Sequence, residues 1–148
     1  MRSYKNIFVI ALLVTMAACQ PKGVAVTPFT GPVRANDDIA SSIKILITAE
    51  NNLETQKVIT PQEGLKVIDG LSALNGANVQ FSIDLAAAKL SGDKSALRPS
   101  LDALRKAVND LNTNGVLGIK SEKAKQVFSL TMGAISLSLG ILEGFVGN

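Results

Sequence analysis

The chain has 148 residues, of which 47% are hydrophobic and 18% charged, with 15 Lys and Arg against 12 Asp and Glu. It contains no histidine, no tryptophan and a single cysteine, which excludes internal disulfides, histidine-based catalysis and the common zinc ligand sets. Removing Arg2 and Lys5 leaves 13 basic residues against 12 acidic ones, so there is no basic field for nucleic acid and we expect no such partner.

The first twenty residues have the layout of an export signal. They hold, in order, a short positive start, an unbroken apolar run and two small residues before a cysteine: Arg2 and Lys5, residues 7–14, Ala17, Ala18 and Cys19. This layout predicts a signal peptide over residues 1–18. An uncleaved membrane helix is disfavoured, because the apolar stretch over residues 7–18 is twelve residues long and falls short of the roughly 20 that span a bilayer. An ordinary signal peptide beside a chance cysteine is the other alternative.

Because two small residues precede the cysteine, this segment resembles the lipobox of bacterial lipoproteins. In that family the peptide is cut before the cysteine, whose thiol receives a diacylglycerol and whose new amine is acylated. The resemblance implies a lipid on Cys19, attachment to the membrane through that lipid, and a place in the bacterial cell envelope. Gln20 follows the cysteine, where an Asp commonly signals retention at the inner membrane of Gram-negative bacteria. The resemblance therefore implies the outer membrane, facing the periplasm, if the host is Gram-negative.

Residues 19–35 are expected to be the lipidated cysteine and a flexible spacer. Prolines and glycines interrupt any regular period there: Pro21, Gly23, Pro28, Gly31 and Pro32. From residue 36 onward the apolar period is helical. We predict an all-α domain over residues 36–148, folded as a small antiparallel four-helix bundle with short loops.

The first predicted helix starts at Asn36 or Asp37 and runs to about residue 57. The second has the clearest start signal, with Thr60 as N-cap, Pro61 at the first helical position and Glu63 at the third, and it ends at Ser91 and Gly92. It carries two apolar stripes, which predicts contact with two neighbours. The main stripe is Leu65, Ile68, Leu71, Leu74, Phe81, Leu85 and Ala88, and the second is Val79, Ile83, Ala86 and Leu90.

The third predicted helix starts between residues 93 and 99. Its apolar residues follow a heptad spacing: Leu97, Leu101, Leu104, Val108 and Leu111. Asn114 and Gly115, which tolerate the left-handed conformation, are expected to stop it. A short connection over residues 116–120 then leads to a fourth helix, capped by Ser121 and running to about residue 144.

The fourth predicted helix is apolar on every side, with no charged residue over residues 127–142. Small residues recur on one stripe, which is a candidate contact face for another helix: Ser129, Gly133, Ser136, Gly140 and Gly144. Such a helix is either buried or membranous. Sixteen residues give about 24 Å of helix against a hydrocarbon core of about 30 Å, which favours the centre of the bundle. The alternative is an exposed helix that binds a partner or a membrane.

No catalytic motif, cofactor motif or metal-ligand set occurs in the chain, and we expect no enzymatic activity. Asp37 and Asp38 are interpreted as acidic residues that offset a helix macrodipole. Asn75 and Asn78 lie near the main stripe of the second helix, either as a buried amide that fixes register or as a recognition point. The sequence thus predicts a lipid-anchored protein that acts by binding or structural presence, with a possible envelope protein partner. The alternative is a membrane-active or membrane-protein-blocking lipoprotein that uses residues 121–146.

Overall fold

The computed structural model describes residues 27–147, so the predicted signal peptide, Cys19 and most of the predicted spacer lie outside the described residues. The fold is an all-α helical bundle, as predicted. Two short segments flank its third helix: the 3₁₀ turn η2 (Ser95–Leu97) and the π-helical segment η3 (Leu111–Val116). The four α-helices are α1 (Thr30–Thr55), α2 (Pro61–Ser91), α3 (Arg98–Asp110) and α4 (Glu122–Gly147).

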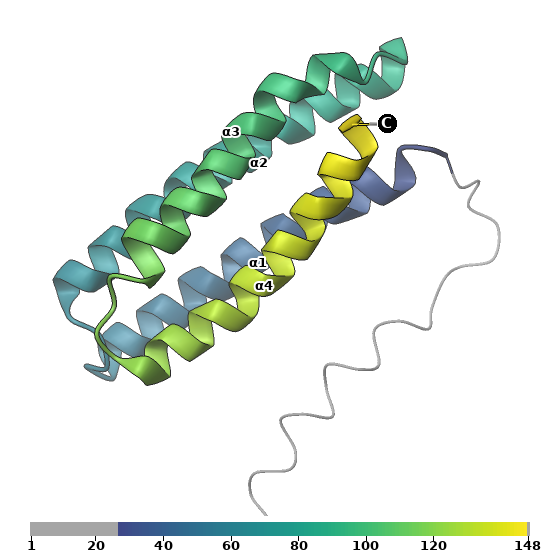
Figure 1. The fold of residues 1–148 in the computed structure, drawn as a ribbon. Helices are drawn as coiled ribbons and strands as arrows, with labels where there is room; N and C mark the ends of the chain where they lie inside the picture. The colour runs from purple at the N-terminus through teal and green to yellow at the C-terminus, as the bar shows by residue number, and fades with distance from the viewer. Residues whose placement is uncertain (1–26, 148) are drawn as a thin grey trace, which may run out of the picture.

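The helices form two antiparallel pairs, α1 with α4 and α2 with α3 (Figure 1). The pairs are joined because α1 also packs against α2, while α3 contacts α4 more sparsely. The start of α1 and the end of α4 meet at one end of the bundle, here called the terminal end. The α1–α2 and α3–α4 connections meet at the opposite end, here called the loop end.

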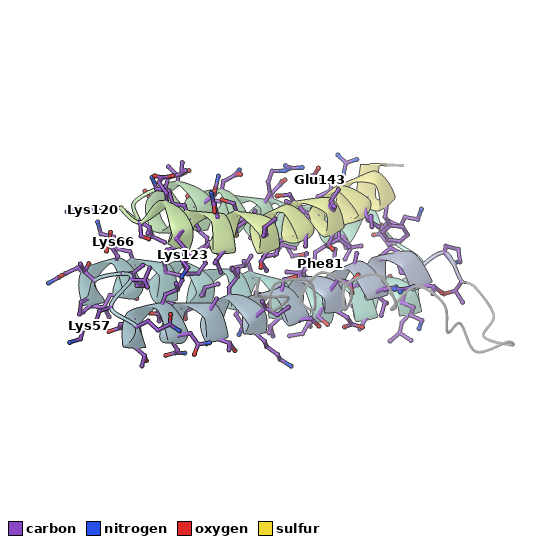
Figure 2. The ribbon with its side chains drawn as sticks, turned by 90° about the horizontal axis from the view of Figure 1, so that it is seen from below. Lys57, Lys66, Phe81, Lys120, Lys123 and Glu143 are labelled. Atoms are coloured by element: carbon purple, nitrogen blue, oxygen red, sulfur yellow. The ribbon has the colours of Figure 1, made fainter. Side chains whose placement is uncertain are left out.

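The core between the pairs is filled by Leu, Ile, Val and Ala, together with Phe81 of α2 and Phe128 of α4. Both phenylalanines are fully buried, and Phe81 lies near the middle of the bundle (Figure 2). The heptad stripe predicted for the third helix is buried throughout: Leu97, Leu101, Leu104, Val108 and Leu111. All four helices thus contribute large apolar side chains to the core.

α1 begins at Thr30, six residues before the predicted start at Asn36, so the prediction of a spacer through residue 35 was wrong over its last residues. Pro32 lies in the first helical turn, where backbone N–H groups have no intrahelical partner and a proline removes no bond. No side chain caps this helix start. The turn is instead stabilised by packing, since Pro32 and Ala35 are buried.

The predicted ends of α2 are confirmed. The Thr60 hydroxyl accepts the Glu63 N–H at 3.3 Å, and the Glu63 carboxylate accepts the Thr60 N–H at 2.7 Å, which completes a capping box. Gly92 ends the helix with φ 76°, a left-handed conformation that glycine adopts without strain. Glu63 also accepts the Lys120 N–H at 2.8 Å, so one carboxylate ties the two connections of the loop end together.

The predicted faces of α2 were partly wrong. Leu65 of the main stripe is 63% exposed, and Val67 is buried in its place. The second stripe lies at the surface rather than against a neighbour: Val79, Ile83, Ala86 and Leu90. α2 does contact two helices, α1 and α3, but it reaches both from its one buried face. In a four-helix bundle the two neighbours of α2 lie close enough to each other that one broad apolar stripe on α2 packs against both.

The predicted stop of the third helix at Asn114 and Gly115 was also wrong. The chain continues through η3, and Gly92 is the only described glycine with a positive φ. η3 presses Leu111 against the backbone of α2, where a Cβ added at Gly70 would lie 2.8 Å from the Leu111 Cδ1 atom. Burial of Leu111 and Val116 therefore outweighs the preference of Asn114 and Gly115 for ending a helix. Ser121 then caps α4, because its hydroxyl accepts the Ala124 N–H at 3.3 Å.

Candidate functional site

The last helix has two largely apolar faces that differ in burial. Its inner face enters the core: Ala124, Phe128, Met132, Ile135, Leu139, Leu142 and Val146 are buried. α4 is thus a helix of the bundle, but the expectation that it lies at the centre was wrong, because only one of its faces is buried. The packing partner is chiefly α1, which runs antiparallel beside it (Figure 1).

The outer face of α4 is exposed although it carries large apolar side chains. Val127 is 37% exposed, Leu130 80%, Leu137 75% and Ile141 53%. All five residues of the predicted small-residue stripe are exposed as well: Ser129, Gly133, Ser136, Gly140 and Gly144. A Cβ added at any of these three glycines would meet no atom within 4 Å. The stripe therefore contacts no other helix of the bundle, and its role as a contact face stays a prediction about an outside partner.

Ion pairs bound the outer face at both ends, and no charge lies between them. Near the loop end Lys125 Nζ lies 2.8 Å from Glu122 Oε1, and near the terminal end Arg105 Nε lies 2.7 Å from Glu143 Oε1. Residues 127–142 carry no charge over about 24 Å of helix. A contiguous exposed apolar strip with a polar rim typically marks an interaction site.

The apolar character of both faces explains why α4 resembles a membrane span. Within residues 27–147 it is the one helix long and apolar enough to cross a membrane by length and composition. Its most apolar window of 18 residues has a mean hydropathy of 1.5, and 33% of that window is buried inside the bundle. The remaining residues of the window belong largely to the exposed outer face.

A groove of about 280 Å³ lies between α3 and α4 near the terminal end. Arg105 occupies it, within 2.8 Å of Asp102 and 2.7 Å of Glu143, and these carboxylates raise the pKa of the guanidinium. Arg105 thus has both carboxylates as partners, and Arg98 also lines the groove. The ion pair between Arg105 and Glu143 links α3 to α4 where their packing is sparse.

Exposed lysines from several segments gather at the loop end, where Figure 2 labels Lys57, Lys66, Lys120 and Lys123. The Glu63 carboxylate lies among them and binds the Lys120 N–H. Its hydrogen bonds to the backbone of Thr60 and then of Lys120 lower the pKa of Glu63. The loop end therefore carries an acidic group, Glu63, beside its exposed lysines.

Glu50 of α1 is a buried carboxyl that the sequence analysis missed, with only 2% of the residue exposed. Burial raises the pKa of Glu50, and the neighbouring Glu54 carboxyl raises it further. Gly64 of α2 leaves room for the pair, because a Cβ there would lie 2.6 Å from Glu50 Oε1 and 3.1 Å from Glu54 Oε2. The sequence signal for the burial of Glu50 was its position four residues after Leu46, on the apolar stripe of α1. The described residues contain no group of three or more metal-ligating side chains.

The two asparagines of α2, Asn75 and Asn78, differ in burial. Asn78 is buried, and its Nδ2 donates to the Asn36 carbonyl oxygen of α1 at 3.5 Å, whereas its Oδ1 is buried with no hydrogen-bond partner among the described residues. Its role in fixing register stays a prediction. Asn75 is exposed. Asp37 and Asp38 are exposed too, but they lie beyond the first turn of α1, so their interpretation as macrodipole partners was wrong.

Comparison of the chain with protein-family models, with curated proteins and with solved structures gives no match. Exposed apolar side chains also occur on α2, at Val79, Ile83 and Leu90, but the outer face of α4 lies on a helix that carries no charge over residues 127–142.

Proposed function

We propose that the protein is a lipid-anchored envelope lipoprotein whose helical bundle acts by binding or structural presence and not by catalysis. The observation that supports the binding role is the exposed, uncharged outer face of α4, whereas the lipid anchor rests on the sequence Ala17-Ala18-Cys19. A helix needed only for the core would place polar residues on its outer side. An apolar outer face lowers solubility without adding to the stability of the bundle, which is expected of a surface that another molecule covers.

The position of the anchor supports the proposal. Residue 27 lies at the terminal end, and only residues 20–26 separate it from Cys19. Seven residues span at most about 25 Å when fully extended. A lipid on Cys19 would therefore keep the terminal end of the bundle close to the bilayer, with more than one acyl chain for durable attachment. A lipoprotein of this kind would act at or near the membrane surface.

The test of the anchor is Cys19→Ser in cells fed a labelled fatty acid. The variant is expected to lose the label and to move from the membrane fraction to the soluble fraction. Gln20→Asp is the matched control, because it keeps the thiol and is expected to keep the label while changing the membrane that retains the protein. Unchanged membrane association of Cys19→Ser would show that another part of the chain holds the protein there.

A second candidate function follows from the length and hydropathy of α4, which suit a membrane-active or membrane-protein-blocking helix. In that case the bundle would open and α4 would enter the bilayer or bind a membrane helix. Purification of residues 20–148 without lipid separates the two functions. A monodisperse protein with a cooperative thermal transition supports the binding bundle, and a product that requires detergent supports the membrane-active helix.

A further inference from the structure

The large exposed residues of α4 are spaced as the seam of a coiled coil. Val127, Leu130, Ala134, Leu137 and Ile141 follow one another at intervals of three, four, three and four, and all are exposed. We call these five residues the outer seam. A helix already packed in the bundle by one face thus carries a second heptad face that points outward.

The residue types in the outer seam favour a particular partner. Val127, Ala134 and Ile141 occupy the first heptad position, and Leu130 and Leu137 occupy the fourth. Within parallel coiled coils, β-branched residues at the first position with Leu at the fourth favour two strands, and Val127 and Ile141 fit this pattern whereas Ala134 does not. Gly133 and Gly140 border the seam and leave space for a second backbone. A lipid surface requires none of these features, and interfacial helices carry Lys, Arg and aromatic residues that residues 129–142 lack.

We infer that the outer seam pairs with the outer seam of a second copy of this chain, with the two α4 helices parallel. Such a symmetric interface places each residue near its own copy, so it must be self-complementary. An uncharged seam meets this condition because it brings no like charges together. Glu122 and Glu143 at its two ends are each paired with a cation of their own chain, Lys125 and Arg105.

The parallel direction rests on the proposed lipid anchor. Two chains anchored in one leaflet hold their terminal ends on the same side, so their α4 helices run the same way. The seam is about 24 Å long and one helix, about 10 Å, wide, which is smaller than the roughly 800 Å² that each partner of a standard complex buries. We therefore expect weak pairing in solution and strong pairing in the membrane, where the anchor raises the local concentration.

Cysteine crosslinking of the full-length protein in membranes tests the inference. Leu130→Cys and Leu137→Cys place a thiol in the seam, and Ser129→Cys and Ser136→Cys are controls that are exposed on the same helix but lie one position away. Mild oxidation is expected to give several-fold more disulfide-linked dimer from the seam variants than from the controls. The wild type sets the baseline for Cys19, and all four changes fall on exposed side chains, so the fold is retained.

The outcomes separate the pairing from the anchor. Equal crosslinking of seam and control positions, no dimer at the seam, or a product with a different protein would overturn the inference. A mixed disulfide between co-expressed Leu130→Cys and Ile141→Cys, stronger than either self-disulfide, would overturn the parallel direction. Membrane fractionation of the same samples reports on the anchor alone. A soluble protein that still crosslinks at the seam would contradict the anchor and support the pairing.

Discussion

A glycine-to-alanine series measures directly what the outer face of α4 contacts. Replacing a glycine inside a helix by alanine gains about 0.8–1.0 kcal/mol of helix propensity. At Gly140 the new Cβ meets nothing within 4 Å, so Gly140→Ala is expected to stabilise the isolated domain by that full amount. At Gly70 the new Cβ would lie 2.8 Å from Leu111 Cδ1 and 3.3 Å from Leu111 Cα. Overpacking costs about 1–3 kcal/mol, so Gly70→Ala is expected to give a net loss.

Thermal unfolding of residues 20–148, followed by circular dichroism at low concentration, is the assay. For a domain of this size 1 kcal/mol shifts the melting temperature by about 3–5 °C. Gly76→Ala is the matched control, since its Cβ also meets nothing within 4 Å and it reports propensity alone. A lower melting temperature for Gly140→Ala than for wild type would refute the reasoning, because it would place the outer face of α4 against another part of the bundle.

Three further changes test the core, the buried carboxyl and the capping box. Leu104→Asp is expected to cost more than about 3 kcal/mol in urea unfolding because it buries an unpaired carboxylate, whereas the exposed Ala103→Asp should stay within about 0.5 kcal/mol; equal midpoints would refute the assigned core face of α3. Glu50→Gln is expected to stabilise the domain at pH 7, because the raised pKa of Glu50 makes its charged form unfavourable when folded. In urea titrations across pH this gain should fade as the pH drops towards the ordinary value of 4.5, where wild type is protonated in both states, and a gain that grew on acidification would contradict the burial of the charge. Glu63→Ala is expected to cost about 1–2 kcal/mol at neutral pH. Since the pKa of Glu63 is lowered, wild type should keep this contribution above pH 4.5 and lose it as the pH falls through the lowered value; a pH-independent difference would count against the capping role.

The parts of the fold that were predictable from the sequence are those with local signals. The Thr60 capping box and the Gly92 stop fix α2 through contacts within three or four residues, so both ends were predicted correctly. The heptad of α3 was predicted correctly too, because a period of apolar residues depends only on the helix itself. Four helices with short connections then left the antiparallel bundle as the natural arrangement.

The errors came from contacts distant in the sequence. α1 starts at Thr30 because Pro32 and Ala35 are buried in the core. No local sequence signal indicates that burial. The third helix continues as η3 because Leu111 packs against Gly70 of α2. Local preference alone would have started α1 and ended the third helix where each was predicted to do so, and tertiary burial overrode it.

The candidate site illustrates the same limit. Both faces of α4 are apolar, so periodicity cannot say which one enters the core. The buried face carries Phe128, Ile135 and Leu142, and the exposed face carries Leu130, Leu137 and Ile141 together with three glycines. Size therefore separates the two faces only in part, and contacts with the other helices decide which face is buried.

Photo-crosslinking in intact cells tests most directly the claim that the outer face of α4 is the working surface. A photoreactive side chain at Leu137 on that face is compared with one at Ile83, an exposed apolar position of α2. We expect a protein adduct from Leu137, with a second copy of the chain as the partner, and none from Ile83. Protein adducts from Ile83 with none from Leu137 would contradict the claim.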